Sequence, residues 1–262
     1  MSEPNALKRR IQASAGKAAK EEGWWETVKI VVEALIIALV VRTLLFQPFN
    51  IPSGSLTPTL LIGDYLFVEK FSYGYSRYTF PFGAWPFGDK MHGRFMGASP
   101  QRGDVVVFKY PQDNSTDFIK RVIGLPGDKI QMINDILYLN GKPVQRERIE
   151  DYVGTLDGEE GHWPQYRETL PGGKSYVTLD KTKDGPLDNT ELFTVPAGHY
   201  FMMGDNRDNS DDSREAVGYV PADNLEGKAL FRFFSTDGSA RFWEIWKWPF
   251  AVRYSRILSL VK

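Results

Sequence analysis

The chain has 262 residues, of which 42% are hydrophobic and 25% are charged, a composition typical of folded globular proteins. Its 32 basic and 33 acidic residues leave no excess positive charge for a phosphate backbone, so nucleic acid is not an expected partner. The lack of cysteine excludes thiol catalysis, disulfides and cysteine-ligated metals. Three widely spaced histidines, His92, His162 and His199, offer little material for a His-based triad or metal site.

The first predicted element is a membrane anchor at Val28–Phe46. As a helix rising ~1.5 Å per residue, this apolar run would be about 28 Å long, close to the hydrocarbon thickness of a bilayer. Charges inside a membrane are costly, but Lys29 and Glu33 are spaced to pair on one helical face, and Arg42 can extend toward the outer interface. The alternative is an amphipathic helix that lies on the membrane or packs on a domain.

The charges on either side of the anchor predict its orientation. Residues 47–67 contain no lysine or arginine, whereas several basic residues precede the anchor: Lys8, Arg9, Arg10, Lys17 and Lys20. By the positive-inside rule, residues 1–27 are predicted to be cytoplasmic and residues 47–262 to be exported. Trp24 and Trp25 stand where an interfacial aromatic anchor is expected.

The exported part is predicted to be mainly β. Short segments rich in β-branched and aromatic residues alternate with turns that contain glycine and proline. Asn140-Gly141, between two apolar runs, is a hairpin signal. The predicted strands are Tyr65–Phe71, Asp104–Tyr110, Phe118–Ile123, Lys129–Ile133, Ile136–Leu139, Ser175–Leu179 and His199–Met203.

Two aromatic stretches depart from this strand pattern. Phe71–Phe95 is crowded with aromatic residues, glycine and proline, and is predicted to be an extended loop. Its aromatic side chains either contact lipid or a partner, or cover the chain's own core. Phe242–Lys262 alternates aromatic and basic residues; a terminal strand followed by a short helix is predicted, with docking on the membrane surface as the alternative.

A polar stretch suggests an insertion. Gln145–Asp188 is rich in charges and turns, which predicts weak strands and loops outside the catalytic core. The predicted fold is therefore an antiparallel β-sheet core formed by residues 47–128 and 190–262. A smaller β-rich region, residues 129–189, is inserted into it, and one transmembrane helix precedes it.

Three segments offer candidate catalytic groups. FNIPSGSLTPTLLIGD places Ser55 beside glycine and between prolines, which suits the display of a hydroxyl near backbone N–H groups, although a turn without function has the same composition. In FIKRVIG, burial of Lys120 would lower its pKa and populate the neutral amine that a base needs; a solvated lysine is the alternative. Gly204–Arg214 (GDNRDNSDDSR) is polar, yet it follows a predicted strand that can carry it into the core, where charges must pair.

Together these segments resemble the bacterial type I signal peptidases. The resemblance lies in PSGSLTPTLLIGD around the serine, in RGDVVVFKYP with FIKRVIGLPGD around the lysine, and in MGDNRDNSDDSR. The motifs occur in order over residues 50–220 and follow the predicted anchor, as that family expects. The resemblance implies a membrane-bound serine endopeptidase that removes N-terminal signal peptides from translocated preproteins after small-x-small sites.

Carried over position by position, the resemblance implies a Ser–Lys dyad in which Ser55 is the nucleophile and Lys120 its general base. Ser53 resembles the serine whose hydroxyl forms the oxyanion hole with the backbone N–H of Ser55. Neutral Lys120 would take the hydroxyl proton as Oγ attacks the scissile carbonyl, and would then protonate the leaving amine.

The resemblance also assigns supporting and substrate-binding positions. Ser210 would orient the lysine, and Asp212 and Arg214 would form a supporting ion pair. The positions that would line shallow S1 and S3 pockets are Ile51, Leu56, Leu60, Phe118 and Ile119. Leu56 departs from the methionine usual after the nucleophile, and the Asp211 position often carries a small residue; neither change touches the dyad.

The resemblance implies no metal and no organic cofactor. It implies preproteins, the lipid bilayer and the secretion translocon as partners. It also implies a single-pass protein of the bacterial inner (plasma) membrane, with its catalytic region periplasmic or extracytoplasmic.

Two alternatives stay open: a related Ser–Lys peptidase that processes a pilin, a conjugation factor or itself, and a membrane-anchored β-domain without catalysis. The anchor and the lack of a DNA-binding module disfavour a self-cleaving repressor.

Overall fold

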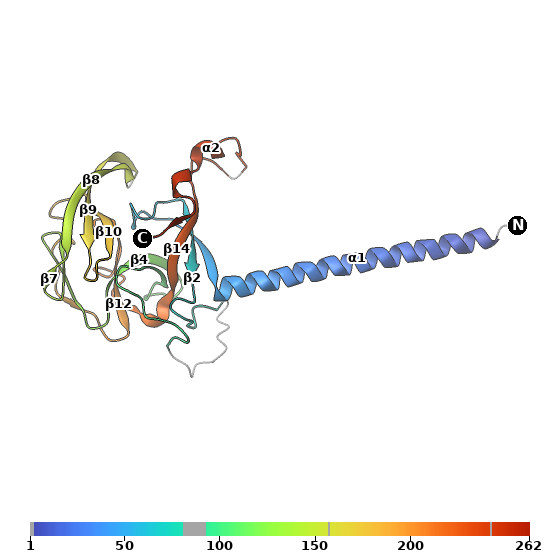
Figure 1. Cartoon of the computed structure of the whole chain (residues 1–262), viewed down its shortest axis with the longest axis horizontal. Helices are drawn as coiled ribbons and strands as arrows, with labels where there is room; N and C mark the ends of the chain where they lie inside the picture. The colour runs from blue at the N-terminus through green and yellow to red at the C-terminus, as the bar shows by residue number, and fades with distance from the viewer. Residues whose placement is uncertain (1–2, 81–92, 157, 242) are drawn as a thin grey trace. The chain divides into compact units, whose positions relative to one another are not determined.

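A computed structural model describes residues 3–80, 93–156, 158–241 and 243–262, with side chains from residue 24 onward. The chain divides into two compact units, Met1–Arg42 and Thr43–Lys262. Figure 1 shows that the first unit is helical and that the second consists mainly of strands joined by loops, with the short helix α2 (Trp248–Ala251). The mainly β class predicted for residues 47–262 is confirmed.

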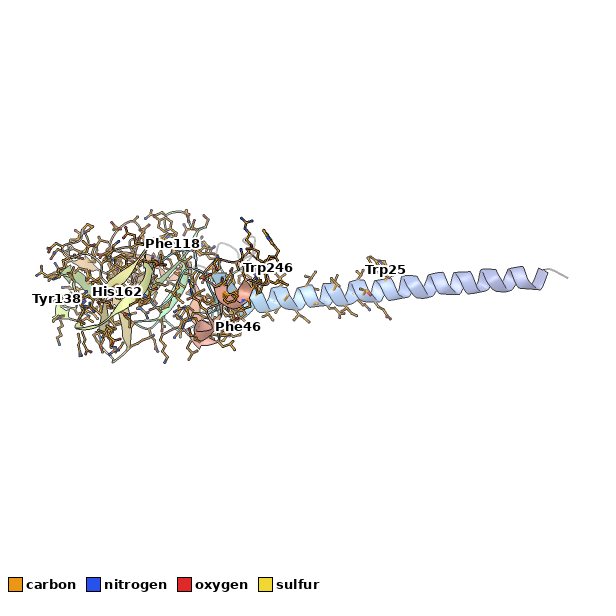
Figure 2. All side chains as sticks on the ribbon, turned by 90° about the horizontal axis from the view of Figure 1, so that it is seen from above. Trp25, Phe46, Phe118, Tyr138, His162 and Trp246 are labelled. Atoms are coloured by element: carbon orange, nitrogen blue, oxygen red, sulfur yellow. The ribbon has the colours of Figure 1, made fainter. Side chains whose placement is uncertain are left out.

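Helix α1 (Glu3–Leu44) is longer than the predicted anchor and ends earlier. The sequence predicts helix as far as Phe46, but Phe46 instead opens a strand and pairs with Glu69, which ends the helical hydrogen bonding. Side chains from residue 24 onward are mostly exposed along this helix, as Trp25 shows in Figure 2. Among the described helices, none combines the length and apolar character needed to cross a membrane, so the predicted anchor is not confirmed.

The largest sheet has eight strands in the order β1-β2-β14-β3-β4-β12-β13, with β15 paired to β14, and all its pairings are antiparallel. The central strand β3 is an apolar run buried along nearly its whole length, as expected for a strand covered on both faces. Register shifts bend β14 against β2 and β3. The strands are β1 (Phe46–Asn50), β2 (Asp64–Glu69), β3 (Val105–Lys109), β4 (Asp117–Gly124), β12 (His199–Met203), β13 (Val220–Pro221), β14 (Leu225–Ser235) and β15 (Ser259–Leu260).

Two smaller antiparallel sheets lie within residues 129–194. One has the strand order β11-β5-β6-β7, and its β6–β7 hairpin turns at Asn140 and Gly141, both with positive φ, as predicted. The other has the order β10-β9-β8, and we name it the β8–β10 sheet. Their strands are β5 (Lys129–Ile133), β6 (Ile136–Leu139), β7 (Lys142–Pro143), β8 (Gln145–Leu156), β9 (Glu159–Thr169), β10 (Ser175–Leu179) and β11 (Phe193–Thr194).

The polar stretch predicted as weak strands and loops is more regular than expected. β8 and β9 are 12 and 11 residues long and pair over almost their full length. Alternation of half-buried and exposed positions along β8, rather than a hydrophobic run, marks a strand with one partly covered face. Strands β1 and β14 are also absent from the sequence prediction.

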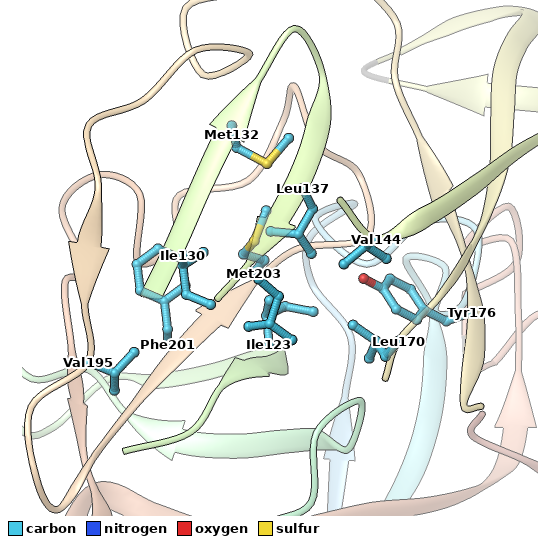
Figure 3. Close-up of a cluster of buried hydrophobic side chains, with 11 residues drawn as sticks. Ile123, Ile130, Met132, Leu137, Val144, Leu170, Tyr176, Val195, Phe201 and Met203 are labelled. Carbon is cyan, nitrogen blue, oxygen red and sulfur yellow. The ribbon is translucent and has the colours of Figure 1, made fainter. Parts of the chain in front are cut away.

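Three clusters of buried side chains form the core of the β unit. One joins the β8–β10 sheet to the strands of both other sheets: Tyr176, Leu170 and Val144 pack with Ile123 and Met203 among others (Figure 3). A second surrounds Phe108 and Met202. In the third, the residues that precede and follow Ser55 pack with β2 and β3: Ile51, Leu56, Leu60, Leu66, Val68, Val105, Val107 and Ala229.

The C-terminal segment reverses the predicted order of elements. After β13 and a short 3-10 turn η3 (Ala222–Asn224), β14 leads to α2 (Trp248–Ala251), η4 (Tyr254–Arg256) and finally β15. The helix therefore precedes the strand, because the chain turns back to pair β15 with β14. Trp246 is 66% exposed in this segment (Figure 2). Phe242, where the predicted segment begins, lies outside the described residues.

The aromatic stretch Phe71–Phe95 forms turns where it is described, as predicted. Tyr75 and Phe95 form an isolated bridge, and the Arg94 guanidinium donates to backbone carbonyls of residues 73, 74, 222 and 225. Residues 81–92 of this predicted loop, His92 included, lie outside the described residues.

Candidate active site

Ser55 lies on a loop that is closed at its base. The backbone N–H of Ile51 donates to the carbonyl of Asp64 (2.9 Å), and that of Gly63 donates to the carbonyl of Ile51 (3.0 Å). The Asp64 carboxylate accepts from the Leu61 N–H and from the Arg256 guanidinium. These bonds and the buried leucines of the loop fix it against the main sheet, so that Ser55 is held in a defined place.

Lys120 projects from β4, directly opposite Val106 of β3. Its side chain is 3% exposed, and Nζ stands 5.8 Å from the centre of the Phe118 ring, two residues earlier on the same face. The predicted pairing of Lys120 and Phe118 on one face of this strand is therefore confirmed.

Ser55 and Lys120 line the same pocket, which has a volume of about 400 Å³. The Ser53 and Ser55 hydroxyls are 3.5 Å apart within it. Among the described residues no hydrogen bond joins Ser55 Oγ to Lys120 Nζ; catalytic hydrogen bonds are often long without substrate and tighten when it binds. The pocket is lined by Pro52, Ser53, Gly54, Ser55, Asp117, Phe118, Ile119, Lys120, Asn209 and Asp211.

The environment of Lys120 increases the fraction of neutral amine. Burial away from water lowers the pKa of Lys120 to about 8, although the carboxylates of Asp212 and Asp211 oppose this shift. A pKa lower by roughly two to three units raises the neutral fraction near pH 7 by roughly 10²- to 10³-fold compared with a free lysine. Burial therefore brings the titration of this amine close to neutral pH.

The Gly204–Arg214 loop is buried despite its polar sequence, because its charges are paired. Both oxygens of the Asp212 carboxylate accept from the Arg214 guanidinium (2.9 and 2.8 Å), and one also accepts from the Gly204 N–H (3.0 Å). Burial opposes ionisation of Asp212, but Arg214 and the backbone donors outweigh it and hold its pKa below the ordinary value. Ser210 Oγ is buried and has no hydrogen-bond partner in the described part of the chain.

The same loop contacts the serine turn through residues that sequence reasoning did not single out. The backbone N–H of Asn206 donates to the Ser55 carbonyl (3.0 Å), and its side-chain amide donates to the Gly54 carbonyl (3.2 Å). Gly204 packs closely enough that an added Cβ would stand 2.5 Å from the Ser55 carbonyl oxygen. Gly204 and Asn206 belong to the GDNRDNSDDSR motif, but the sequence alone does not show that they contact the turn around Ser55.

The five predicted substrate-binding residues divide into two groups. Phe118 and Ile119 line the pocket. The other three, Ile51, Leu56 and Leu60, are at most 3% exposed and belong to the core cluster against which Ile119 also packs. The sequence did not predict four other residues that line the pocket: Pro52, Asp117, Asn209 and Asp211.

Two histidines and a cluster of three aspartates lie outside the pocket lining. His162 and His199 lie on β9 and β12, outside the pocket lining. Oxygens of three carboxylates approach within 4.8 Å of one another and could in principle hold a cation: Asp135, Asp180 and Asp188. Arg146 already pairs with Asp180, so a cationic side chain occupies this cluster.

Comparison with known proteins places this geometry in context. The sequence profile of the family described as "Signal peptidase, peptidase S26" matches residues 24–234. A signal peptidase I from Rickettsia conorii (strain Malish 7) is 43% identical over 235 residues, which cover 86% of this chain and 83% of that protein. One from Rickettsia canadensis (strain McKiel) is 45% identical over 219 residues, 81% of this chain and 79% of that protein. A crystal structure of a signal peptidase I from Enterococcus faecalis V583 is 32% identical and covers 50% of this chain and 97% of its own, with a TM-score of 0.31.

Proposed function

Because this chain belongs to the signal peptidase family, peptidase S26, we propose that Ser55 and Lys120 are the nucleophile and general base of its endopeptidase reaction. The observation that carries the proposal is the shared pocket, which is lined both by Ser55 and by a lysine whose pKa burial lowers to about 8. No metal or organic cofactor enters the proposed reaction.

The proposed reaction has two steps. Neutral Lys120 Nζ takes the Ser55 hydroxyl proton as Oγ bonds to the scissile carbonyl carbon and the carbonyl oxygen becomes an oxyanion. The Ser53 hydroxyl and the Ser55 N–H are the proposed donors to that oxyanion, each worth roughly 2.7–4 kcal/mol. When the C–N bond breaks, the Lys120 ammonium gives its proton to the leaving amine. An ester between Ser55 Oγ and the acyl group remains. In the second step Lys120 takes a proton from water as the water oxygen bonds to the ester carbon; the C–Oγ bond then breaks and the Lys120 ammonium returns the proton to Ser55 Oγ.

The substrates of a signal peptidase carry signal peptides, and we assign the small-x-small preference to the apolar lining of this cleft. Phe118 and Ile119 contribute to the pocket wall, and Ile119 packs on the cluster that contains Ile51, Leu56 and Leu60. A packed apolar wall favours side chains the size of alanine, because larger ones would overlap it.

Ser210 and the Asp212–Arg214 pair are proposed as supports for Lys120. Asp212 and Arg214 act on the pKa of Lys120 in opposite directions, the carboxylate raising it and the guanidinium lowering it. The Ser210 hydroxyl, buried and unpartnered in the described structure, is available to orient the amine.

The test compares Ser55→Ala and Lys120→Ala with the controls Ser115→Ala and Lys129→Ala, all as full chains in detergent. Cleavage of a preprotein with an Ala-x-Ala site should be lost in both site variants and kept in both controls, which alter exposed residues. Circular dichroism should show the same fold in all four. Wild-type turnover by either site variant would exclude the dyad.

We also propose that the helical part of the predicted anchor, residues 28–44, holds the chain in the bacterial inner (plasma) membrane, with residues 1–27 cytoplasmic and residues 47–262 periplasmic or extracytoplasmic. The bilayer and the secretion translocon would then be its partners. Support comes from the exposed apolar side chains of α1 and from the lysines and arginines that precede them.

The absence of cysteine makes this topology directly testable. A single cysteine at Ser14 or at Ser115 can be labelled with a membrane-impermeant maleimide in intact spheroplasts. Labelling at position 115 alone is expected. Equal labelling at both positions, or release of the chain by high salt, would contradict a spanning anchor.

A further inference from the structure

The β8–β10 sheet is joined to the Gly204–Arg214 loop by backbone hydrogen bonds. Leu179, the last residue of β10, forms a parallel bridge with Asn206. The Leu179 N–H donates to the Asp205 carbonyl (2.8 Å), and the Arg207 N–H donates to the Leu179 carbonyl (2.9 Å). Asn206, held between these two bonds, is the residue that donates to the Ser55 carbonyl. A continuous backbone path therefore runs from β10 to the serine turn.

A buried ionic contact joins the same two elements through side chains. Glu168 of β9 accepts from the Arg207 guanidinium (2.6 Å) and from the Tyr176 hydroxyl of β10 (2.6 Å). All three side chains are at most 4% exposed. The Arg207 carbonyl accepts in turn from the Arg214 guanidinium (2.8 Å), which pairs with Asp212 near Lys120.

Tyr176 also contacts the strand that carries Lys120. The Arg121 guanidinium stands 4.4 Å from the centre of the Tyr176 ring, and the ring packs in the cluster of Figure 3. Arg121 and Lys120 are neighbours on β4. Tyr176 therefore contacts both the strand that carries Lys120 and, through Arg207, the Gly204–Arg214 loop that bonds to the Ser55 carbonyl.

We propose that the β8–β10 sheet clamps the catalytic groups, with Glu168 and Tyr176 as positioning residues that fix the Gly204–Arg214 loop against Ser55 and Lys120. The inference rests on the proposed roles of Ser55 and Lys120. Its physical basis is directional: a buried charge pair with a shared hydroxyl constrains distance and angle, whereas apolar contacts constrain mainly volume. Small displacements of positioned groups cost large factors in rate.

The first test is Glu168→Gln, with Glu147→Gln on β8 of the same sheet as the matched control. The Glu147 side chain is 64% exposed, and its ion pair with the exposed Arg167 is long, at 3.9 Å. Glu147→Gln should therefore leave kcat and KM unchanged. Glu168→Gln should lower kcat for peptide cleavage roughly 10- to 100-fold and change KM much less, because the apolar residues of the cleft wall, Phe118 and Ile119, lie on β4 and not on the loop that loosens. A folded Glu168→Gln with wild-type kcat and only a lower Tm would overturn the proposal.

Glu168→Gln leaves Arg207 without its carboxylate and can therefore impair folding, so a milder variant is needed. Tyr176→Phe keeps the ring against Arg121 and removes only the hydroxyl that donates to Glu168. A several-fold loss of kcat is expected, while Tyr166→Phe on β9 should leave kcat unchanged. Equal kcat in Tyr176→Phe and Tyr166→Phe would also overturn the proposal.

Hydrogen exchange separates failure of the clamp from failure of the proposed catalytic roles. In Tyr176→Phe and Glu168→Gln, amides of residues 50–64 and 204–214 should exchange faster than in the controls, whatever the catalytic residues are. Unchanged exchange in both segments would reject the clamp. Faster exchange together with full cleavage by Ser55→Ala would instead reject the proposed catalytic roles and keep the clamp.

Discussion

Lys120 and Arg121 are adjacent on β4 and both are buried, yet their pKa values shift in opposite directions because their surroundings differ. On one face Lys120 lines the pocket, with no ion pair in the described structure, and burial lowers its pKa to about 8. On the other face Arg121 makes two 2.7 Å bonds to the Asp205 carboxylate, which outweighs burial and raises its pKa. The Arg121 charge is thus balanced by a carboxylate, whereas the Lys120 amine makes no ion pair in the described part of the chain.

The difference follows from side-chain chemistry as well as from position. A lysine loses its proton when it is buried without a partner, whereas an arginine stays charged and needs a carboxylate. Exchanging the two residues would leave a guanidinium in the pocket, where it could not serve as a base.

The largest effect is expected from removing the unpaired amine. Lys120→Met should reduce cleavage roughly 10²- to 10⁴-fold. It should also raise the free energy of unfolding at pH 7 by about 1–3 kcal/mol, because the folded wild type there carries an ammonium that burial disfavours. Denaturant unfolding measures this, with Lys129→Met as the surface control.

The stability of the wild-type protein should also depend on pH. The folded pKa of Lys120 lies below that of the unfolded chain, so wild-type stability should rise as pH increases from about 8 to ~10.4, and Lys120→Met should lack that rise. A Lys120→Met variant less stable than wild type at pH 7 would mean that the amine is paired or hydrated.

Breaking the paired face should act on stability. Asp205→Asn leaves the Arg121 guanidinium buried without a counter-charge and should cost about 3–5 kcal/mol in the free energy of unfolding. The double variant Arg121→Met/Asp205→Leu should recover most of that loss, since no buried charge remains. A change in the free energy of unfolding of less than about 0.5 kcal/mol in the single variant would mean that Asp205 is not needed to offset the burial of the Arg121 charge.

A smaller effect is expected where the Gly204–Arg214 loop approaches Ser55. In Gly204→Ala the new Cβ would overlap Ser210 Oγ and stand 2.5 Å from the Ser55 carbonyl oxygen, so the loop must shift. Activity should fall roughly 10- to 100-fold in a folded protein. Gly154→Ala is the control, because the three atoms nearest to its added Cβ all belong to the Tyr152 side chain of its own strand, which can move without shifting the backbone. Equal kcat/KM in the two variants would contradict this tight contact.

The smallest effect concerns the acid at the rim of the pocket. Wild-type kcat/KM should rise with pH through about 8 as Lys120 loses its proton. Asp211 raises the pKa of Lys120, so Asp211→Asn should move this midpoint to lower pH, whereas Glu215→Gln, an exposed control in the following turn, should move it less. A shift to higher pH in Asp211→Asn would contradict the assignment.

Local sequence patterns predicted part of the fold well. β5, β6, β10 and β12 have the predicted boundaries, because each is a short apolar or alternating run between turn residues. β14 was not predicted, since glycine and charged residues interrupt LEGKALFRFFS and its pairing with distant β2 and β3 decides its conformation. β8 and β9 stabilise each other by pairing, which their polar composition hides.

The sequence by itself determined the family, the serine and lysine motifs and the mainly β class, because those depend on residue types at fixed local spacing. The tertiary structure decided which charges are neutralised. Arg121 and Lys120 are neighbours in sequence but lie on opposite faces of β4, and Asp205 and Glu168 reach their arginines from distant parts of the chain. A pKa or a buried ion pair depends on distance and on exclusion of water, and both arise only when remote segments pack together.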